Sequence, residues 1–200
     1  MIEVKNIYKS FNKTQVLNKI DTIFYRGKTN LIIGQSGSGK TVLLKCLLGL
    51  YEVDLGEILY DGISSKNMGI NEKLEISRQM GMVFQGSALF DSMNVLENVR
   101  FPLDMLTEID ENEKNERALK FIERVNLKDA IEKLPSELSG GMQKRVAIAR
   151  AIVLNPKYLF CDEPNSGLDP KTAIVIDKLI QEITKEYNIT TIINSHDMNS

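Results

Sequence analysis

Residues 29–48 read TNLIIGQSGSGKTVLLKCLL, and this stretch contains the pattern G-x-x-x-x-G-K-[ST] between two apolar runs. The run before the first glycine, Thr29 to Ile33, lacks strict alternation, which predicts a strand buried on both faces of a parallel sheet. The run after Lys40 predicts a helix that carries Val42, Leu43, Leu44, Leu47 and Leu48. The order strand, glycine-rich turn, helix favours an α/β fold.

The same turn predicts a phosphate site. Glycines let successive backbone N–H groups converge on an anion, and the N-terminus of the following helix adds about half a positive charge. Lys40 can reach the β- and γ-phosphates of a nucleotide, and the Thr41 hydroxyl can bind Mg²⁺. The predicted phosphate-binding residues are Gly34, Gln35, Ser36, Gly37, Ser38, Gly39, Lys40 and Thr41.

Composition excludes several other classes. The chain has 25 Lys and Arg against 27 Asp and Glu, so a surface that grips nucleic acid is disfavoured. With 1 His and 2 Cys, no zinc cluster with ligand spacing can be built. The start lacks a basic segment followed by an apolar one, so no signal peptide is expected. The longest apolar stretch, residues 42–50, is shorter than the ~20 residues that cross a bilayer.

Strands and helices alternate along the chain. Strands are predicted over residues 2–11, 16–24, 29–33, 56–60, 82–84, 158–161 and 190–194, and helices over 42–48, 112–125, 139–155 and 171–187. The first two strands, joined by a turn at Asn12-Lys13, predict antiparallel pairing at the N-terminus. Residues 56–60, followed by Asp61-Gly62, predict a hairpin strand that closes on a turn. The alternation of strands and helices predicts a three-layer α/β core with a largely parallel sheet, and the residues after Gln85 predict a mostly helical insertion.

A second motif ends the apolar strand YLFC at 158–161 with two adjacent carboxylates, Asp162 and Glu163. Alternation along a strand is expected to turn the two side chains in different directions. Asp162 can then hold Mg²⁺, while Glu163 faces the γ-phosphate and acts as general base on the attacking water. Taken alone, such a pair is also found at turns and helix caps.

A phosphate loop with nearby carboxylates could also belong to a GTPase or a kinase. Residues 18–21, NKID, even match the guanine-reading pattern N-K-x-D, but they precede the phosphate loop, whereas the GTPase motif follows it. The segment LSGGMQ at 138–143, at the start of a predicted helix, decides against both alternatives. Ser139 and the amides of Gly140 and Gly141 offer hydrogen-bond donors at a helix N-terminus.

With this segment the whole chain resembles the ATP-binding cassette (ABC) family. The motifs occur in the family's order: the phosphate loop, Gln85, LSGGMQ at 138–143 (the signature), Asp162-Glu163, SGLD at 166–169 and His196. The resemblance implies a P-loop NTPase core of the RecA-like type with N-terminal antiparallel strands and a helical subdomain. It also implies one domain over residues 1–200, with the core at 1–85 and 153–200 and the helical subdomain at about 86–152.

Further roles come from the resemblance. In this family two cassettes sandwich two ATP molecules head to tail, so a second copy of the chain is the expected partner. Gln85 is expected to sense the γ-phosphate and Mg²⁺, and His196 to bind the γ-phosphate and hold the attacking water. Expected to contact nucleotide are Phe11, which stacks on adenine, together with Val42, Ser139, Gly140, Gly141 and Asp169. Asn165 stands where Thr or Ser is commoner.

Two stretches resemble a narrower group, the ATPases of Mla/Mce-type phospholipid transporters. They are residues 33–45, with the pair Thr41-Val42 in place of the commoner Ser-Thr, and residues 83–103. This resemblance implies a membrane permease beside Gln85, lipid-transfer accessory subunits and a place on the cytoplasmic face of the inner membrane. Leu89, Phe90 and Met93 are candidate contacts for the permease, or they pack within the helical subdomain.

The alternatives are an importer or lipoprotein-release cassette, and a non-transport ABC ATPase of DNA repair or translation. The second class often carries long coiled-coil insertions, and the 54 positions between Gln85 and Ser139 (139 − 85) leave room only for a small helical subdomain. Cassettes of this family normally continue beyond the histidine, whereas this chain ends four positions after His196, at Ser200. A truncated chain with weak activity in isolation is therefore expected.

Overall fold

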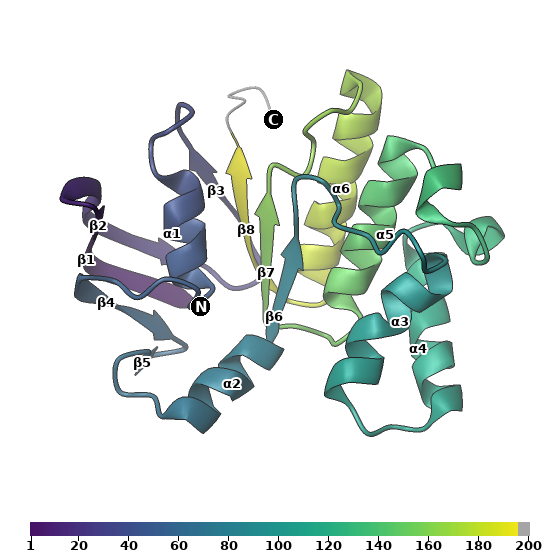
Figure 1. Ribbon diagram of the computed structural model, residues 1–200, viewed down its shortest axis with the longest axis horizontal. Coiled ribbons are helices and arrows are strands. Elements are labelled where there is room, and N and C mark those ends of the chain that lie inside the picture. The colour runs from purple at the N-terminus through teal and green to yellow at the C-terminus, as the bar shows by residue number, and fades with distance from the viewer. Residues whose placement is uncertain (196–200) are drawn as a thin grey trace.

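Two sheets organise the molecule, which is represented by a computed structural model that describes residues 1–195 (Figure 1). The antiparallel sheet has the order β2-β1-β4-β5, with the bounds β1 (Ile2–Phe11), β2 (Thr14–Phe24), β4 (Leu55–Tyr60) and β5 (Ile63–Ser64). The parallel sheet has the order β3-β8-β7-β6, with the bounds β3 (Thr29–Ile33), β6 (Met80–Val83), β7 (Tyr158–Asp162) and β8 (Thr190–Ser195).

Helices cover both faces of the parallel sheet. Helix α1 lies between the two sheets, and α5 and α6 lie on the other side, with α3 and α4 packed beyond α5 (Figure 1). Their bounds are α1 (Lys40–Leu47), α2 (Ile70–Arg78), α3 (Val95–Leu106), α4 (Glu111–Arg124), α5 (Gly140–Ile152) and α6 (Pro170–Glu186). Two short 3₁₀ helices, Lys128–Ala130 and Pro135–Glu137, connect α4 to α5. Within residues 1–195 we find no helix with the length and apolar character that a membrane crossing requires.

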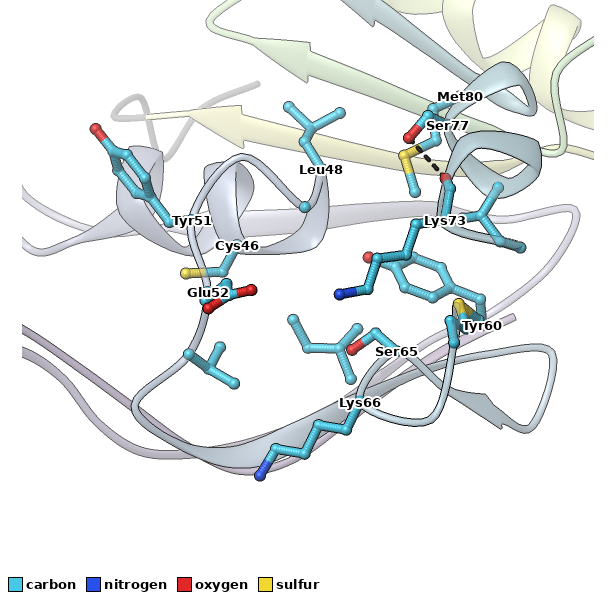
Figure 2. A pocket seen from close by; sticks show the side chains of 15 residues that line it. Cys46, Leu48, Tyr51, Glu52, Tyr60, Ser65, Lys66, Lys73, Ser77 and Met80 are labelled. Carbon is cyan, nitrogen blue, oxygen red and sulfur yellow. Dashed lines mark hydrogen bonds between the residues drawn. The ribbon is translucent and has the colours of Figure 1, made fainter. Parts of the chain in front are cut away.

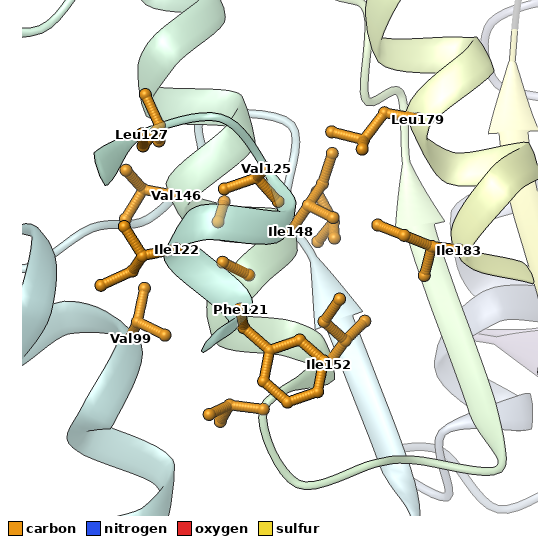
Figure 3. Close-up of a cluster of buried hydrophobic side chains, with 14 of the residues drawn as sticks. Val99, Phe121, Ile122, Val125, Leu127, Val146, Ile148, Ile152, Leu179 and Ile183 are labelled. Carbon is orange, nitrogen blue, oxygen red and sulfur yellow. The ribbon is translucent and has the colours of Figure 1, made fainter. Parts of the chain in front are cut away.

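Two hydrophobic cores meet at β7. Leu159 and Cys161 point into the core formed with α3, α4, α5 and α6, which Figure 3 shows from within. Tyr158 and Phe160 point to the opposite face, into the core formed with α1 and the antiparallel sheet. All four side chains are at most 1% exposed. Strand β7 therefore serves both cores, and its alternation fixes α1 and α5 on opposite faces of the sheet.

The predicted order of strands and helices is confirmed, as is the turn at Asn12-Lys13, where both residues have positive φ angles of 47° and 68°. The prediction that residues 29–33 are buried on both faces is wrong, because β3 lies at the edge of the parallel sheet, with Leu31 46% and Ile33 49% exposed.

The sequence analysis did not predict α2. None of its residues is buried, and the one apolar pair at helical spacing, Ile70 and Leu74, is 81% and 56% exposed. Its start is instead marked by Glu72, whose carboxylate accepts from the N–H of Gly69.

The register of the parallel sheet brings the carboxyl ends of four strands to one edge. Val83 pairs with Cys161, and Asp162 pairs with Asn194. On the far side of β8, Ile33 pairs with Ser195. The residues that follow these strands, including Gln85, Glu163 and the phosphate loop, consequently emerge at the same edge, where α/β proteins place their ligands.

Candidate functional site

The phosphate loop connects β3 to the N-terminus of α1. Its Gly39 has a φ of 92°, a left-handed conformation that a side chain would strain. A Cβ there would also lie 3.1 Å from the carbonyl oxygen of Val16 and 3.2 Å from Leu17 Cδ2, so glycine lets the loop pack against β2. The first turn of α1 contains no acidic residue, which leaves the positive end of the helix dipole available for an anion.

Lys40 is the first residue of α1, and its ammonium folds back over the loop. Its Nζ donates to the carbonyl oxygens of Gly34 at 2.7 Å and Gln35 at 3.1 Å. Ser38 N–H donates to the Gln35 oxygen at 3.2 Å and closes the turn. A cation held at the mouth of a glycine-rich turn is suited to receive phosphate oxygens.

The two carboxylates follow β7 as predicted, but alternation does not set the direction of the second. Asp162 is the last residue of the strand, and its Oδ1 accepts from Asn194 Nδ2 at 3.1 Å. Glu163 has already left the strand with a φ of 47°, a left-handed conformation that is costly for a residue with a side chain. Its N–H donates to the Asn194 carbonyl oxygen at 3.1 Å, which anchors the turn to β8.

Gln85 reaches the same place from the neighbouring strand, two residues beyond β6. Its Nε2 donates to Glu163 Oε2 at 3.1 Å and to Ser166 Oγ at 3.1 Å. Two side chains that are 78 positions apart in the chain are thus joined directly. The structure brings the predicted residues Gln85, Asp162 and Glu163 together beside the phosphate loop, and α1 packs against β7 and β8.

Two residues of this site were missed by the sequence analysis. Asn194, which is fully buried, joins both carboxylate positions through its side chain and its main chain. Lys144 of α5 donates to the main-chain carbonyl oxygen of Gln85 from a position that is only 5% exposed. Both could have been found as polar residues beside apolar runs, because Asn194 ends an apolar strand and Lys144 precedes the run VAIA at 146–149.

The signature lies at the start of α5, on the opposite face of the parallel sheet from α1. Ser139 is the N-cap of α5 and its Oγ accepts from Met142 N–H at 3.3 Å, while the first helical turn has no acidic residue. Gly140 is exposed, and Gly141 is buried and faces Thr172 of α6. Because the sheet separates the two helices, the phosphate loop and the signature of one chain do not form a single site.

Asp169 is the N-cap of α6. Its carboxylate accepts from the Thr172 hydroxyl at 2.5 Å and from the N–H groups of Lys171 and Thr172 at 3.1 Å. These bonds, with the Thr172 hydroxyl first, hold the pKa of Asp169 below its ordinary value. Its neighbour Asn165 is tied to the same helix, because Asn165 Nδ2 donates to Asp177 Oδ1 at 2.7 Å. Both residues fix the turn that carries Ser166.

Phe11 lies at the end of β1, at the tip of the hairpin whose second strand contacts the phosphate loop. Its ring is 37% exposed and meets the edge of Tyr51 at 5.3 Å between centroids. Lys9 Nζ lies 5.3 Å from the same ring. A partly exposed aromatic ring is therefore carried by the hairpin that contacts the phosphate loop, outside the group formed by Gln85, Asp162 and Glu163.

The donors that could hold Mg²⁺ are the Thr41 hydroxyl, an Asp162 carboxylate oxygen and the Gln85 side-chain oxygen. These are the hard oxygen ligands that Mg²⁺ prefers, and the small number of them leaves positions for water and phosphate. Residues 1–195 contain no group of three or more His, Cys, Asp or Glu side chains that could hold a metal ion. The donor set fits an ion that is held jointly by the protein and a nucleotide.

Comparison with known proteins identifies the family. The sequence profile described as "ABC transporter" matches residues 17–166, a span that contains the phosphate loop, Gln85, the signature and both carboxylates. The chain belongs to the ABC transporter family.

Two curated relatives are similar along nearly all of this chain. The methionine import ATP-binding protein MetN of Clostridium tetani is 41% identical over 198 residues, which cover 99% of this chain and 62% of MetN. The probable ribonucleotide transport ATP-binding protein mkl of Mycobacterium leprae is 38% identical over 198 residues, which cover 99% of this chain and 57% of mkl. The chain thus spans about three fifths of the length of these relatives.

Solved ABC structures share the fold. CbiO1 of Clostridium perfringens, described as part of the transporter complex cbiONQ, has a TM-score of 0.91 and 32% identity, covering 98% of this chain and 78% of CbiO1. The dimeric bacterial cassette MJ0796 has a TM-score of 0.86 and 32% identity, covering 100% of this chain and 89% of MJ0796. MJ0796 has also been solved as a dimer after hydrolysis, bound to ADP and Pi. These likenesses confirm the predicted α/β cassette fold.

A cavity of about 350 Å³ lies away from the nucleotide motifs of this ABC chain, between the C-terminal end of α1 and α2. Figure 2 shows Glu52 and Lys73 on opposite sides of it, and its lining also includes the apolar side chain of Met80. None of the predicted nucleotide-binding residues lines this cavity. The cavity is therefore separate from the candidate nucleotide site.

The remaining predicted residues are the candidate permease contacts Leu89, Phe90 and Met93, and His196. Leu89 packs against the core of the helical side, while Phe90 is 40% exposed and stacks at a tilt on Phe101 with centroids 4.6 Å apart. Met93 is partly exposed next to them. The predicted role of His196 concerns a position outside the described residues, and it stays a prediction.

Proposed function

We propose that this chain is the ATP-binding and ATP-hydrolysing subunit of an ABC transporter. The observation that carries the proposal is the bond of 3.1 Å between Gln85 Nε2 and Glu163 Oε2, at the sheet edge from which the phosphate loop also emerges. In this proposal Gln85 is the polar sensor and Glu163 is the carboxylate base, and both act on a phosphate held by the loop. The ADP and Pi bound to the similar cassette MJ0796 support the same chemistry.

In the proposed mechanism the phosphate loop binds the triphosphate. The loop amides and the N-terminus of α1 hold the β- and γ-phosphates, and Lys40 exchanges its bonds to Gly34 and Gln35 for bonds to phosphate oxygens. Thr41, Asp162 and Gln85 would hold Mg²⁺ through their side-chain oxygens, and the ion would neutralise charge on the phosphates. Phe11 offers its exposed ring to the adenine base.

Glu163 then acts as general base. Its carboxylate accepts a proton from the attacking water, whose oxygen forms a bond to the γ-phosphorus as the bond to the ADP oxygen breaks. The products are ADP and inorganic phosphate. Gln85 holds the Glu163 carboxylate by the bond of 3.1 Å, and Asn194 holds the Glu163 main chain, so the base is oriented before the nucleotide arrives.

A second copy of the chain completes each site. The signature of one chain lies across the sheet from its own phosphate loop, so the exposed residues Ser139 and Gly140 would meet the γ-phosphate held by a partner. The buried Gly141 would take part through its main-chain N–H group. Asp169 fixes the turn between the two sites. The dimeric structure of MJ0796, with 32% identity to this chain, supports a pair of cassettes. Two ATP molecules would lie between the two copies.

Substitution of Glu163 tests the enzymatic part of the proposal. Glu163→Gln keeps the shape and a hydrogen-bond acceptor for Gln85 but removes the base, so hydrolysis should fall by about 10²–10⁴-fold while Mg·ATP binding is retained. Size-exclusion chromatography should show an ATP-dependent dimer of this variant. Glu116→Gln, on the exposed side of α4, is the matched control. Hydrolysis by Glu163→Gln at the unaltered rate would assign the base to another group.

The transported substrate is the finer part of the proposal, and we assign it as phospholipid moved between bacterial membranes. The resemblance of residues 33–45 and 83–103 to Mla/Mce-type ATPases supports this assignment. It implies an integral-membrane permease, lipid-transfer accessory subunits and a place on the cytoplasmic face of the inner membrane. The second candidate is import of a small solute, favoured by the printed name of MetN, a methionine import protein.

Affinity purification of the chain from its own membranes separates the two candidates. Recovery of a permease together with lipid-transfer subunits supports phospholipid transport. Recovery of a permease with a solute-binding protein favours the importer and overturns the lipid assignment. Neither result affects the Glu163→Gln test, which concerns ATP hydrolysis alone.

A further inference from the structure

We propose that Lys144 is a positioning residue that fixes the main chain at Gln85 and so couples the signature helix α5 to Glu163 of the same chain. The inference rests on the proposed ATPase function and adds to it a residue outside the motifs that contact nucleotide. The observations behind it are the burial of Lys144, its hydrogen bond and the position of α5.

Lys144 is a buried cation that is directed at one carbonyl group. Its side chain is 5% exposed, and its Nζ donates to the main-chain oxygen of Gln85. An ammonium at such a position costs free energy unless it is hydrogen-bonded, so the lysine and the carbonyl hold each other in place. A residue needed only to fill space in this core would be apolar, as Val146 and Ile148 are.

A second cation of α5 holds the continuation of the same segment. The Arg150 guanidinium donates to the carbonyl oxygens of Ser87 and Ala88, each at 2.8 Å. Ser87 and Ala88 have positive φ angles of 62° and 48°, an unusual conformation that turns consecutive carbonyl groups toward α5. The segment after β6 is therefore fastened to α5 at three carbonyl oxygens, and Lys144 holds the one that belongs to Gln85.

The position of Lys144 on α5 connects two functional ends. Ser139, the N-cap that would face the partner's nucleotide, lies five positions earlier, which is about 7 Å along a helix. Lys144 contacts Gln85, and Gln85 in turn contacts the base, since Gln85 Nε2 donates to Glu163 Oε2 at 3.1 Å. A shift of α5 on engaging one nucleotide would thus move Gln85, and with it the base that serves the other nucleotide of the dimer.

The test uses Lys144→Met, which keeps the length of the side chain and removes its charge and its donor. We expect kcat to fall about tenfold or more with little change in KM for ATP, because Lys144 acts on an outer contact of the site and not on the phosphate loop. Lys120→Met, on the exposed face of α4, is the matched control. Lys144→Arg keeps a cation that can donate to a carbonyl and should restore most of the activity.

Two further measurements separate positioning from a merely structural role. Hydrogen–deuterium exchange should quicken in peptides that span residues 84–88 of Lys144→Met, with peptides of α1 unchanged. In a Gln85→Ala background, Lys144→Met should lower kcat no further, because its effect passes through the Gln85 side chain. If Lys144→Met does not fold, Lys144→Gln carries the same measurements.

Unchanged exchange at residues 84–88, or a loss of kcat that adds fully to that of Gln85→Ala, would overturn the role of Lys144. An unaltered chain that binds ATP as a dimer without hydrolysing it would instead overturn the proposed function. In that event the exchange measurement still decides whether Lys144 holds the segment.

Discussion

At the scale of single residues, Glu163 shows how the site is held in a costly conformation. Its φ of 47° lies in the left-handed region, which costs about 1–2 kcal/mol for a residue with a side chain. Two hydrogen bonds hold this residue in place. Its carboxylate accepts from the side chain of Gln85, and its N–H donates to the carbonyl oxygen of Asn194. A strained carboxylate with such support is typical of positions where orientation matters to function.

Lys40 is the single residue whose removal should most directly lower the affinity for Mg·ATP. Its ammonium donates to Gly34 and Gln35 and would transfer to phosphate oxygens on binding, so Lys40→Ala removes charge-assisted bonds that contribute about 1.5–3 kcal/mol each. We expect Mg·ATP affinity to fall by at least about tenfold for one such bond in a calorimetric titration. Lys66→Ala, at the rim of the distant cavity, should titrate like the unaltered chain. Equal affinity of the two variants would place the phosphate elsewhere.

The sequence predicted the residues of the site better than their contacts. The phosphate loop and Asp162 follow from local patterns, since each is a turn or strand end read over a few consecutive positions. The bond between Gln85 and Glu163 joins residues 78 positions apart, and the burial of Lys144 depends on how α5 packs. No local pattern encodes either contact, because both arise only when the sheet and α5 have assembled.

At the scale of elements, burial explains which helices could be predicted. Helices α4 and α6 carry apolar residues at helical spacing, and their buried members include Phe121 and Ile180. Helix α2 buries none of its 9 residues, and its sequence offers only one apolar pair at helical spacing, Ile70 and Leu74. The mostly helical character predicted after Gln85 is seen in α3, α4 and α5, whose buried side chains form one core (Figure 3).

Gly81 provides the element-scale prediction, because it lets β6 approach α5. A Cβ at this position would lie 2.2 Å from the main-chain oxygen of Ala151, a group that cannot rotate away. Gly81→Ala should therefore push α5 from the sheet and lower the free energy of unfolding by about 1–3 kcal/mol. Urea denaturation measures the change.

Gly86→Ala serves as its control, since a Cβ there meets nothing within 4 Å. Equal stability of Gly81→Ala and Gly86→Ala would show that β6 and α5 tolerate a wider separation.

At the scale of the whole molecule, the two cores each contain one cysteine. Cys46 lies with α1 in one core, and Cys161 lies on β7 in the other. Burial raises the pKa of Cys46 to about 11 and also raises the pKa of Cys161. A raised pKa keeps the thiol protonated at pH 8, so neither cysteine should react in the folded chain, whereas unfolding returns both to an ordinary pKa of about 8.5.

This difference in cysteine reactivity between the folded and unfolded chain can report whether the two cores unfold together. Pulse labelling at pH 8 over a urea series, read by mass spectrometry, should modify Cys46 and Cys161 at the same midpoint, because β7 belongs to both cores. Cys46→Ser and Cys161→Ser identify each signal. Labelling of one cysteine well below the midpoint of the other would show that the cores unfold separately.

The placement of α1 and α5 on opposite faces of one sheet has a genetic consequence. In the proposed pair of chains, each nucleotide would lie between the loop of one and the signature of the other. A chain defective at Lys40 and a chain defective at Ser139 would then combine their defects in a single site, and the remaining site would be assembled from intact parts. Two alleles that are each inactive alone would complement one another, whereas two alleles altered in the same motif would not.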